Sequence, residues 1–128
     1  MRTAILPTMA LAACSTSEPQ VTQAASSPSY DGIETRLLDG DLVNFRVAVS
    51  GNATAADASD YAECAAAQYT LIRGYLFARH LRTSVEEGAG RLTADAVYTI
   101  SPDLPRGART IDAEVTVAAC GQSGIPTV

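Results

Sequence analysis

The chain has 128 residues, which is enough for one domain and too short for two of ordinary size. Its 14 acidic residues outnumber nine basic ones, and the formal net charge is -5. Proteins that bind nucleic acid need clustered positive charge, so this balance argues against a nucleic acid partner. Alanine supplies much of the 47% hydrophobic content and tryptophan is absent, which predicts a small, tightly layered core.

The amino-terminal segment has the three parts of a signal peptide in order. Met1-Arg2 supplies positive charge, the stretch from Ala4 to Ala10 is mostly apolar, and Leu11-Ala12-Ala13-Cys14 provides a small-residue exit. A stretch this short cannot cross a bilayer, because a spanning helix needs about 20 apolar residues. We therefore predict that residues 1–13 are a signal peptide.

The segment Leu11-Ala12-Ala13-Cys14 resembles the lipobox of bacterial lipoproteins. The resemblance implies that Cys14 receives a diacylglyceryl group through a thioether and, after cleavage, a further acyl chain such as palmitate. Two or more chains anchor a protein stably, whereas one does not. The alternative is an ordinary secretory signal with an incidental cysteine.

A lipidated Cys14 predicts a periplasm-facing protein of the bacterial cell envelope. No aspartate follows Cys14, and Ser15-Thr16 in its place favours the outer membrane over the inner. Residues 14–29 are then the lipidated cysteine and a polar, proline-containing tether, which has an end-to-end distance of about 20 Å. Residues 30–128 form the single domain.

Two alternating segments open this domain. Leu42 to Val49 places valines and Phe45 on one face, as in a half-buried strand. Ile33 to Leu38 reads as its partner, because Asp39-Gly40-Asp41 between them is a strong hairpin signal. We expect a β-hairpin here.

The segment from Ala55 to Arg73 predicts one long helix. Thr54 and Asp57 have the form of a capping box, and neither glycine nor proline occurs before Gly74. The predicted apolar stripe has spacings of three and four. It runs through Ala58, Tyr61, Ala62, Ala65 and either Leu71 or Ile72.

Three further alternating segments complete the predicted fold. Tyr75 to Arg82 and Leu92 to Ile100 flank the turn residues Glu87 to Gly90, and Ile111 to Val117 gives a last strand. The fold class is therefore predicted as α+β, with an antiparallel sheet of about four to five strands and one long helix packed on one face.

A pattern of small and aromatic residues between about residues 45 and 100 is similar to a group of small bacterial envelope lipoproteins of unknown function. The resemblance implies an α+β fold and an envelope location, and it supplies no active site. Its residues are Gly51-Asn52, Tyr61, Ala65-Ala66, Gly74-Tyr75 and Phe77.

Two cysteines remain once Cys14 is committed to lipid. An even number in an oxidising compartment points to a disulfide between Cys64 and Cys120, worth about 4 kcal/mol in the chain-entropy model. The alternative is two buried free thiols, which are common in protein cores.

His80 is the single histidine, which excludes metal sites built on paired imidazoles. It can join Cys64 and Cys120 in a zinc site, or activate one of them as a nucleophile, only if both thiols are free. We therefore expect neither a metal nor a cofactor. A patch of Arg79, His80 and Arg82 can bind an anionic group, and the alternative is a solvated strand face.

No catalytic constellation emerges from the sequence, so we do not expect an enzyme. The leading expectation is a lipoprotein that binds the membrane through its lipid and presents a rigid sheet surface to an envelope protein partner. The alternative is a small-ligand binding module between helix and sheet. Its candidate lining residues are Tyr61, Tyr69, Tyr75 and Tyr98.

Overall fold

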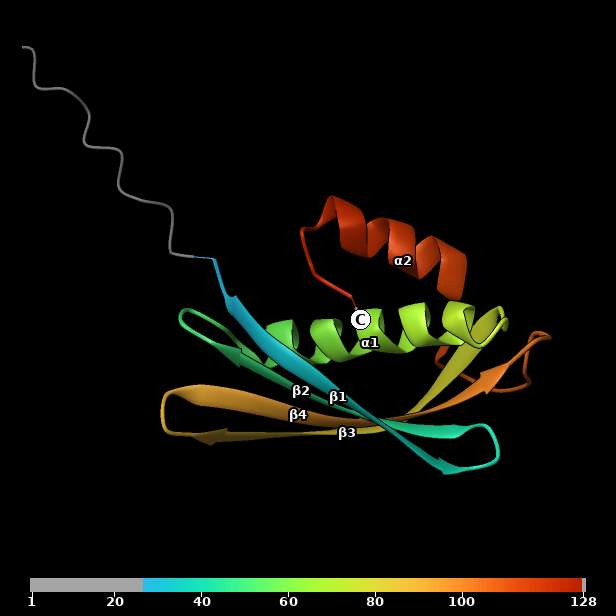
Figure 1. The fold of residues 1–128 in the computed structure, drawn as a ribbon, viewed down its shortest axis with the longest axis horizontal. Helices are drawn as coiled ribbons and strands as arrows, with labels where there is room; N and C mark the ends of the chain where they lie inside the picture. Colours follow the sequence, from blue (N-terminus) through green and yellow to red (C-terminus); the bar gives the residue numbers. More distant parts are fainter. Residues whose placement is uncertain (1–26, 128) are drawn as a thin grey trace, which may run out of the picture.

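The computed structural model describes residues 27–127, so the predicted signal peptide and Cys14 lie outside the described residues. Five antiparallel strands form one curled sheet in the order β1-β2-β4-β3-β5 (Figure 1). The elements in chain order are β1 (Ser29–Asp39), β2 (Leu42–Ser50), α1 (Ala55–Ile72), β3 (Phe77–Gly88), β4 (Arg91–Ser101), β5 (Thr110–Asp112) and α2 (Ala113–Gln122).

The helices form two layers above the sheet. Helix α1 crosses one sheet face, and α2 lies on the far side of α1 (Figure 1). The α+β class and the antiparallel sheet agree with the sequence prediction, but the prediction of one long helix is wrong, since residues 27–127 contain two helices, of 18 and 10 residues. In the part of the chain that the structure describes, neither helix is both long and apolar enough to cross a membrane.

The ends of α1 follow from local hydrogen bonds. Thr54 accepts from the Asp57 amide, and the Asp57 carboxylate accepts from the Thr54 amide, which is the predicted capping box. At the other end the amides of Gly74 and Tyr75 donate to the carbonyls of Leu71 and Thr70. This pattern needs a left-handed residue, and Gly74 supplies it with a φ of 76°.

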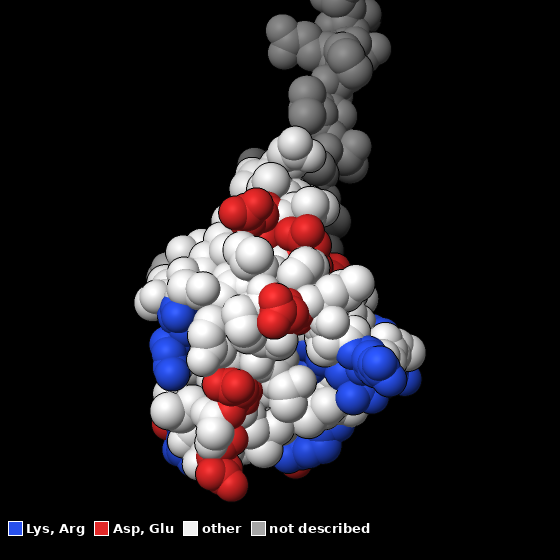
Figure 2. All heavy atoms as spheres, turned by 90° about the vertical axis from the view of Figure 1, so that its right-hand side faces the viewer, with Lys and Arg blue, Asp and Glu red and all other residues white. Residues whose placement is uncertain are grey.

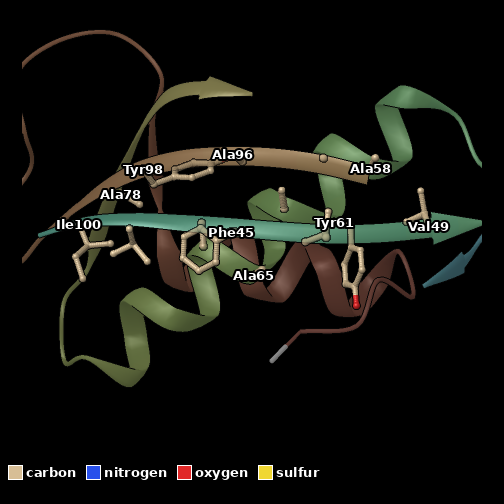
Figure 3. Close-up of a cluster of buried hydrophobic side chains, with 14 residues drawn as sticks. Phe45, Val49, Ala58, Tyr61, Ala65, Ala78, Ala96, Tyr98 and Ile100 are labelled. Carbon is tan, nitrogen blue, oxygen red and sulfur yellow. The ribbon is translucent and has the colours of Figure 1, made fainter. Parts of the chain in front are cut away.

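The core lies between α1 and the two central strands of the sheet (Figure 3). Alternate residues of β2 and β4 point toward α1, and α1 contributes small residues and Tyr61 to the same core. Phe45 makes edge-to-face contacts with Tyr69 and Tyr98. The strand residues of this core are Val43, Phe45, Val47, Val49, Ala78, Ala94, Ala96, Tyr98 and Ile100.

Helix α1 is buried on two sides, which a single apolar stripe did not predict. Ala58, Tyr61, Ala62 and Ala65 face the sheet as expected. Cys64 and Ala67, on another side of the helix, are equally buried, and Cys64 is bonded to α2. The predicted end of the stripe is wrong at Ile72, which is 61% exposed because the helix ends there.

The predicted last strand is mostly helical. Only Thr110–Asp112 pairs with β3, and α2 begins at the next residue. The Asp112 side chain accepts a hydrogen bond from the Val115 amide, which caps the helix. The alternation from Ile111 to Val117 predicted a strand. Alanines and a capping residue favour a helix over the same residues, so this prediction was wrong.

Candidate functional site

The described surface contains a cleft of about 300 Å³ beside α1, where the helix meets the β3 and β5 edge of the sheet. Its wall on the helix side is acidic, and its floor and opposite wall carry an imidazole, a phenol, hydroxyls and a guanidinium. This mixture of polar groups around a cavity makes it a candidate binding site. The lining residues are Ser59, Asp60, Glu63, His80, Thr83, Tyr98, Arg109, Thr110 and Ile111.

A β-bulge in β3 places two of these residues together. The pairing with β4 shifts between His80 and Arg82, so that His80 lies opposite Tyr98 and Thr83 opposite Ala96. Residues three apart in a regular strand point to opposite faces, and the bulge removes this alternation. As a result His80 Nε2 lies 2.6 Å from Thr83 Oγ1 on the α1 side of the sheet.

The His80 imidazole is partly buried and lies near the positive charge of Arg109. Burial and the nearby Arg109 guanidinium lower its pKa, while a hydrogen bond to the Arg82 backbone acts in the opposite direction. The ring also packs edge-to-face on Tyr98, with centroids 5.1 Å apart. The folded protein therefore disfavours the charged form of His80.

Two carboxylates on neighbouring turns of α1 form the acidic wall. Burial, followed by the charge of Asp60, raises the pKa of Glu63, and burial followed by the charge of Asp57 raises the pKa of Asp60. Burial and the same two carboxylates also raise the pKa of Tyr98, whose side chain is 3% exposed. The phenol therefore stays protonated.

The wall opposite α1 includes a residue with an unusual backbone conformation. Arg109 has a φ of 63°, a left-handed conformation that costs a non-glycine residue free energy. Its carbonyl accepts a hydrogen bond of 3.0 Å from the His80 amide, which ties this wall to the bulged strand. The next residue, Thr110, has a buried hydroxyl with no hydrogen-bond partner among the described residues.

The structure does not bring together the predicted basic patch. His80 faces α1 by regular alternation with Ala78, whereas Arg79 lies on the other face of the sheet and the bulge after His80 places Arg82 there as well. Arg79 Nε donates to the Ala108 carbonyl at 3.4 Å, and Arg82 lies 3.8 Å from Asp95 in an exposed ion pair. An anion site made of these three side chains has no support in this arrangement.

The predicted tyrosine-lined space is filled. Tyr61 is buried against Tyr30, with ring centroids 4.8 Å apart, and Tyr69 packs on Phe45. Tyr75 donates to the Asp41 carboxylate at 3.3 Å. Among the four tyrosines proposed from the sequence, Tyr98 alone lines the cleft.

Cys64 and Cys120 form a disulfide in the structure, joining α1 to α2 with their Cα atoms 6.0 Å apart. The two sulfurs are then unable to bind zinc or act as nucleophiles. Within residues 27–127, no group of three or more histidine, cysteine, aspartate or glutamate side chains is placed to hold a metal ion.

Most residues of the cleft were not predicted from the sequence. Asp60 and Glu63 are three apart on a predicted helix, so their shared side was available from spacing alone. Arg109 and Thr110 had no such signal, because the segment before β5 carries no regular pattern. The bulge that places Thr83 beside His80 is also invisible in the sequence.

A second surface stands out at the end of the molecule that carries the β1–β2 turn, the end of α1 and the segment before β5. Figure 2 faces this end and shows mainly uncharged surface, with acidic side chains among it and arginines toward its edges. Leu104, the most exposed of the large apolar side chains, is 70% exposed. We call this surface the distal end. Its exposed apolar residues are Leu37, Leu38, Ile72, Leu76, Leu104 and Val115.

Comparison with known proteins gives a family and a distant relative. The profile of the family described as YNQ4 C-terminal domain matches residues 30–124. A Paracoccus denitrificans protein named "Uncharacterized 26.9 kDa protein in nqo8 5'region" is 32% identical over 85 residues, which are 66% of this chain. The match covers 33% of that protein, so this chain corresponds to about a third of its length. No solved structure matches.

The position of His80 predicts its titration. We expect the single histidine resonance in a proton NMR titration to give a pKa below the ordinary 6.5, because the folded protein disfavours the imidazolium. Stability should therefore fall as the pH drops below 6.5, where the unfolded chain binds the proton more readily. Arg109→Gln should raise the pKa, and the control Arg46→Gln, on the opposite sheet face, should leave it unchanged. An unchanged pKa in Arg109→Gln would contradict the cleft geometry.

Proposed function

This chain belongs to the YNQ4 C-terminal domain family, and we propose that it is a lipid-anchored protein of the bacterial envelope whose domain is a non-catalytic protein-interaction module. The observation that carries the proposal is the position of the exposed apolar residues. They gather at the distal end, away from the strand end through which the chain leads back to Cys14.

The anchor rests on the amino-terminal pattern. Leu11-Ala12-Ala13-Cys14 closes a short apolar stretch, and only a thiol can take the diacylglyceryl group. The disulfide between Cys64 and Cys120 supports an oxidising compartment such as the periplasm, because cytosolic thiols stay reduced. The 15 residues from Ser15 to Ser29 reach at most about 50 Å, so the domain would stay near the bilayer.

The direction of β1 supports an outward-facing distal end. The strand begins at Ser29, beside Ser50 and the start of α1, and Leu37 lies near its other end. At about 3.3 Å per residue these ends are roughly 25 Å apart. A domain held at Ser29 would carry its exposed leucines on the side away from the bilayer.

The occupant we propose for the distal end is an envelope protein with an apolar surface and basic groups among its apolar residues. Single exposed leucines are normal, but several gathered at one end are typical of interaction sites. Asp39, Asp41 and Asp103 lie on the same end. A second copy of this chain would bring these carboxylates against one another, which disfavours self-association.

The anchor is tested by metabolic labelling of bacteria with an alkyne fatty acid. We expect the wild-type protein to carry the label and to sediment with membranes, and Cys14→Ser to lose both properties. The control Cys64→Ala/Cys120→Ala should remain labelled, because its cysteine changes lie in the folded domain. Unlabelled, water-soluble wild-type protein would overturn the lipoprotein proposal.

The interaction surface is tested with a photocrosslinking residue in place of Leu104 in the anchored protein. We expect one adduct of defined mass that differs from the mass of a dimer, and we expect Cys14→Ser to weaken it, because the lipid no longer confines both partners. The matched control is Leu81, which is also exposed, at 39%, but lies on β3 outside the distal end. An adduct only with a second copy, or equal adducts from both positions, would contradict the proposed occupant.

A further inference from the structure

The cleft beside α1 carries opposite charges on facing walls, and these charges are not used within the domain. Among residues 27–127, the side chains of Asp60, Glu63 and Arg109 take part in none of the salt bridges or side-chain hydrogen bonds. An acid and a base that line one cavity without pairing leave room for a ligand between them. The buried Thr110 hydroxyl in the same wall also has no partner.

The floor of the cleft selects for a small polar molecule. The Tyr98 and His80 rings present aromatic surface at an interplanar angle of 62°, and the pair formed by His80 and Thr83 offers hydrogen-bonding groups. The cavity of about 300 Å³ is at the small end of the range for small-molecule sites. The site fits a ligand the size of a metabolite and not a chain segment with bulky side groups.

We propose that this cleft binds a small zwitterion that carries an ammonium group and a carboxylate, of which an α-amino acid is the simplest kind. The ammonium group lies against Asp60 and Glu63, and the carboxylate lies toward Arg109 with the Thr110 hydroxyl as a further donor. Aromatic faces at the floor add a favourable environment for the cation. Binding relieves the cost of holding Glu63 charged in a half-buried position.

Ligands with one kind of charge fit this arrangement less well. A simple anion meets the two carboxylates of α1, and a simple cation meets the Arg109 guanidinium. The like charge on one wall lowers the affinity of each, whereas a zwitterion uses both walls. Specificity for the pair of groups is therefore the expected signature of the site.

The probes are the twenty common L-amino acids, with ethylamine and propionate as the separated halves. The folded protein is titrated with each while the His80 imidazole resonance is followed by NMR. We expect at least one amino acid to shift this resonance with a Kd of about 1 mM or tighter. Ethylamine and propionate should bind at least about 10-fold more weakly. Shifts from no amino acid, or equal affinity for ethylamine, would overturn the proposal.

Two variants and two matched controls assign the walls. Glu63→Gln and Arg109→Gln should each weaken amino acid binding by about 10-fold or more, because each removes one charged partner. Glu86→Gln and Arg46→Gln make the same changes at exposed positions outside the cleft, and their affinity should equal that of the wild type. Thr110→Val is a second test of the wall that carries Arg109. Unchanged affinity in both Arg109→Gln and Thr110→Val would contradict the carboxylate position.

Discussion

The structure depends on a helix of small side chains held between two layers. Ala58, Ala62 and Ala65 let α1 lie close to the sheet, and the Cys64–Cys120 disulfide holds α2 on another side of the same helix. Helix α2 has little packing of its own, because only Ala113 and Cys120 are buried along its length. The disulfide closes a separation of 56 residues, which stabilises the fold by about 4 kcal/mol in the chain-entropy model.

The same covalent link shapes the cleft. Helix α2 follows β5 without a connecting loop, since Asp112 ends the strand and caps the helix. Holding Cys120 on α1 therefore restrains the carboxyl-terminal end of the segment that carries Arg109 and Thr110. Asp60 and Glu63 lie just before Cys64 on α1, so the disulfide restrains the segments that carry both walls of the cleft.

The elements predicted correctly are those whose residue pattern fits only one type of secondary structure. The hairpin around Gly40 and the helix after Thr54 follow from alternation, turn residues and a capping box, and the structure confirms them. The segment from Ile111 to Val117 is compatible with both a strand and a helix. The hydrogen bond by which Asp112 caps α2 favours the helix. The side chains that share the face of His80 were beyond prediction, because the bulge after His80 shifts the pairing with β4 and leaves no mark on the alternation.

The most direct measurement is amide hydrogen exchange of the oxidised protein and of Cys64→Ala/Cys120→Ala, read together with the His80 titration. Loss of the disulfide should speed exchange throughout α2 and β5 while β2 and β4 stay protected, and the pKa of His80 should move up toward its ordinary value as Arg109 is released. Equal protection of α2 in both proteins, with an unchanged His80 pKa, would contradict the claim that this bond holds the outer helix and the cleft in place.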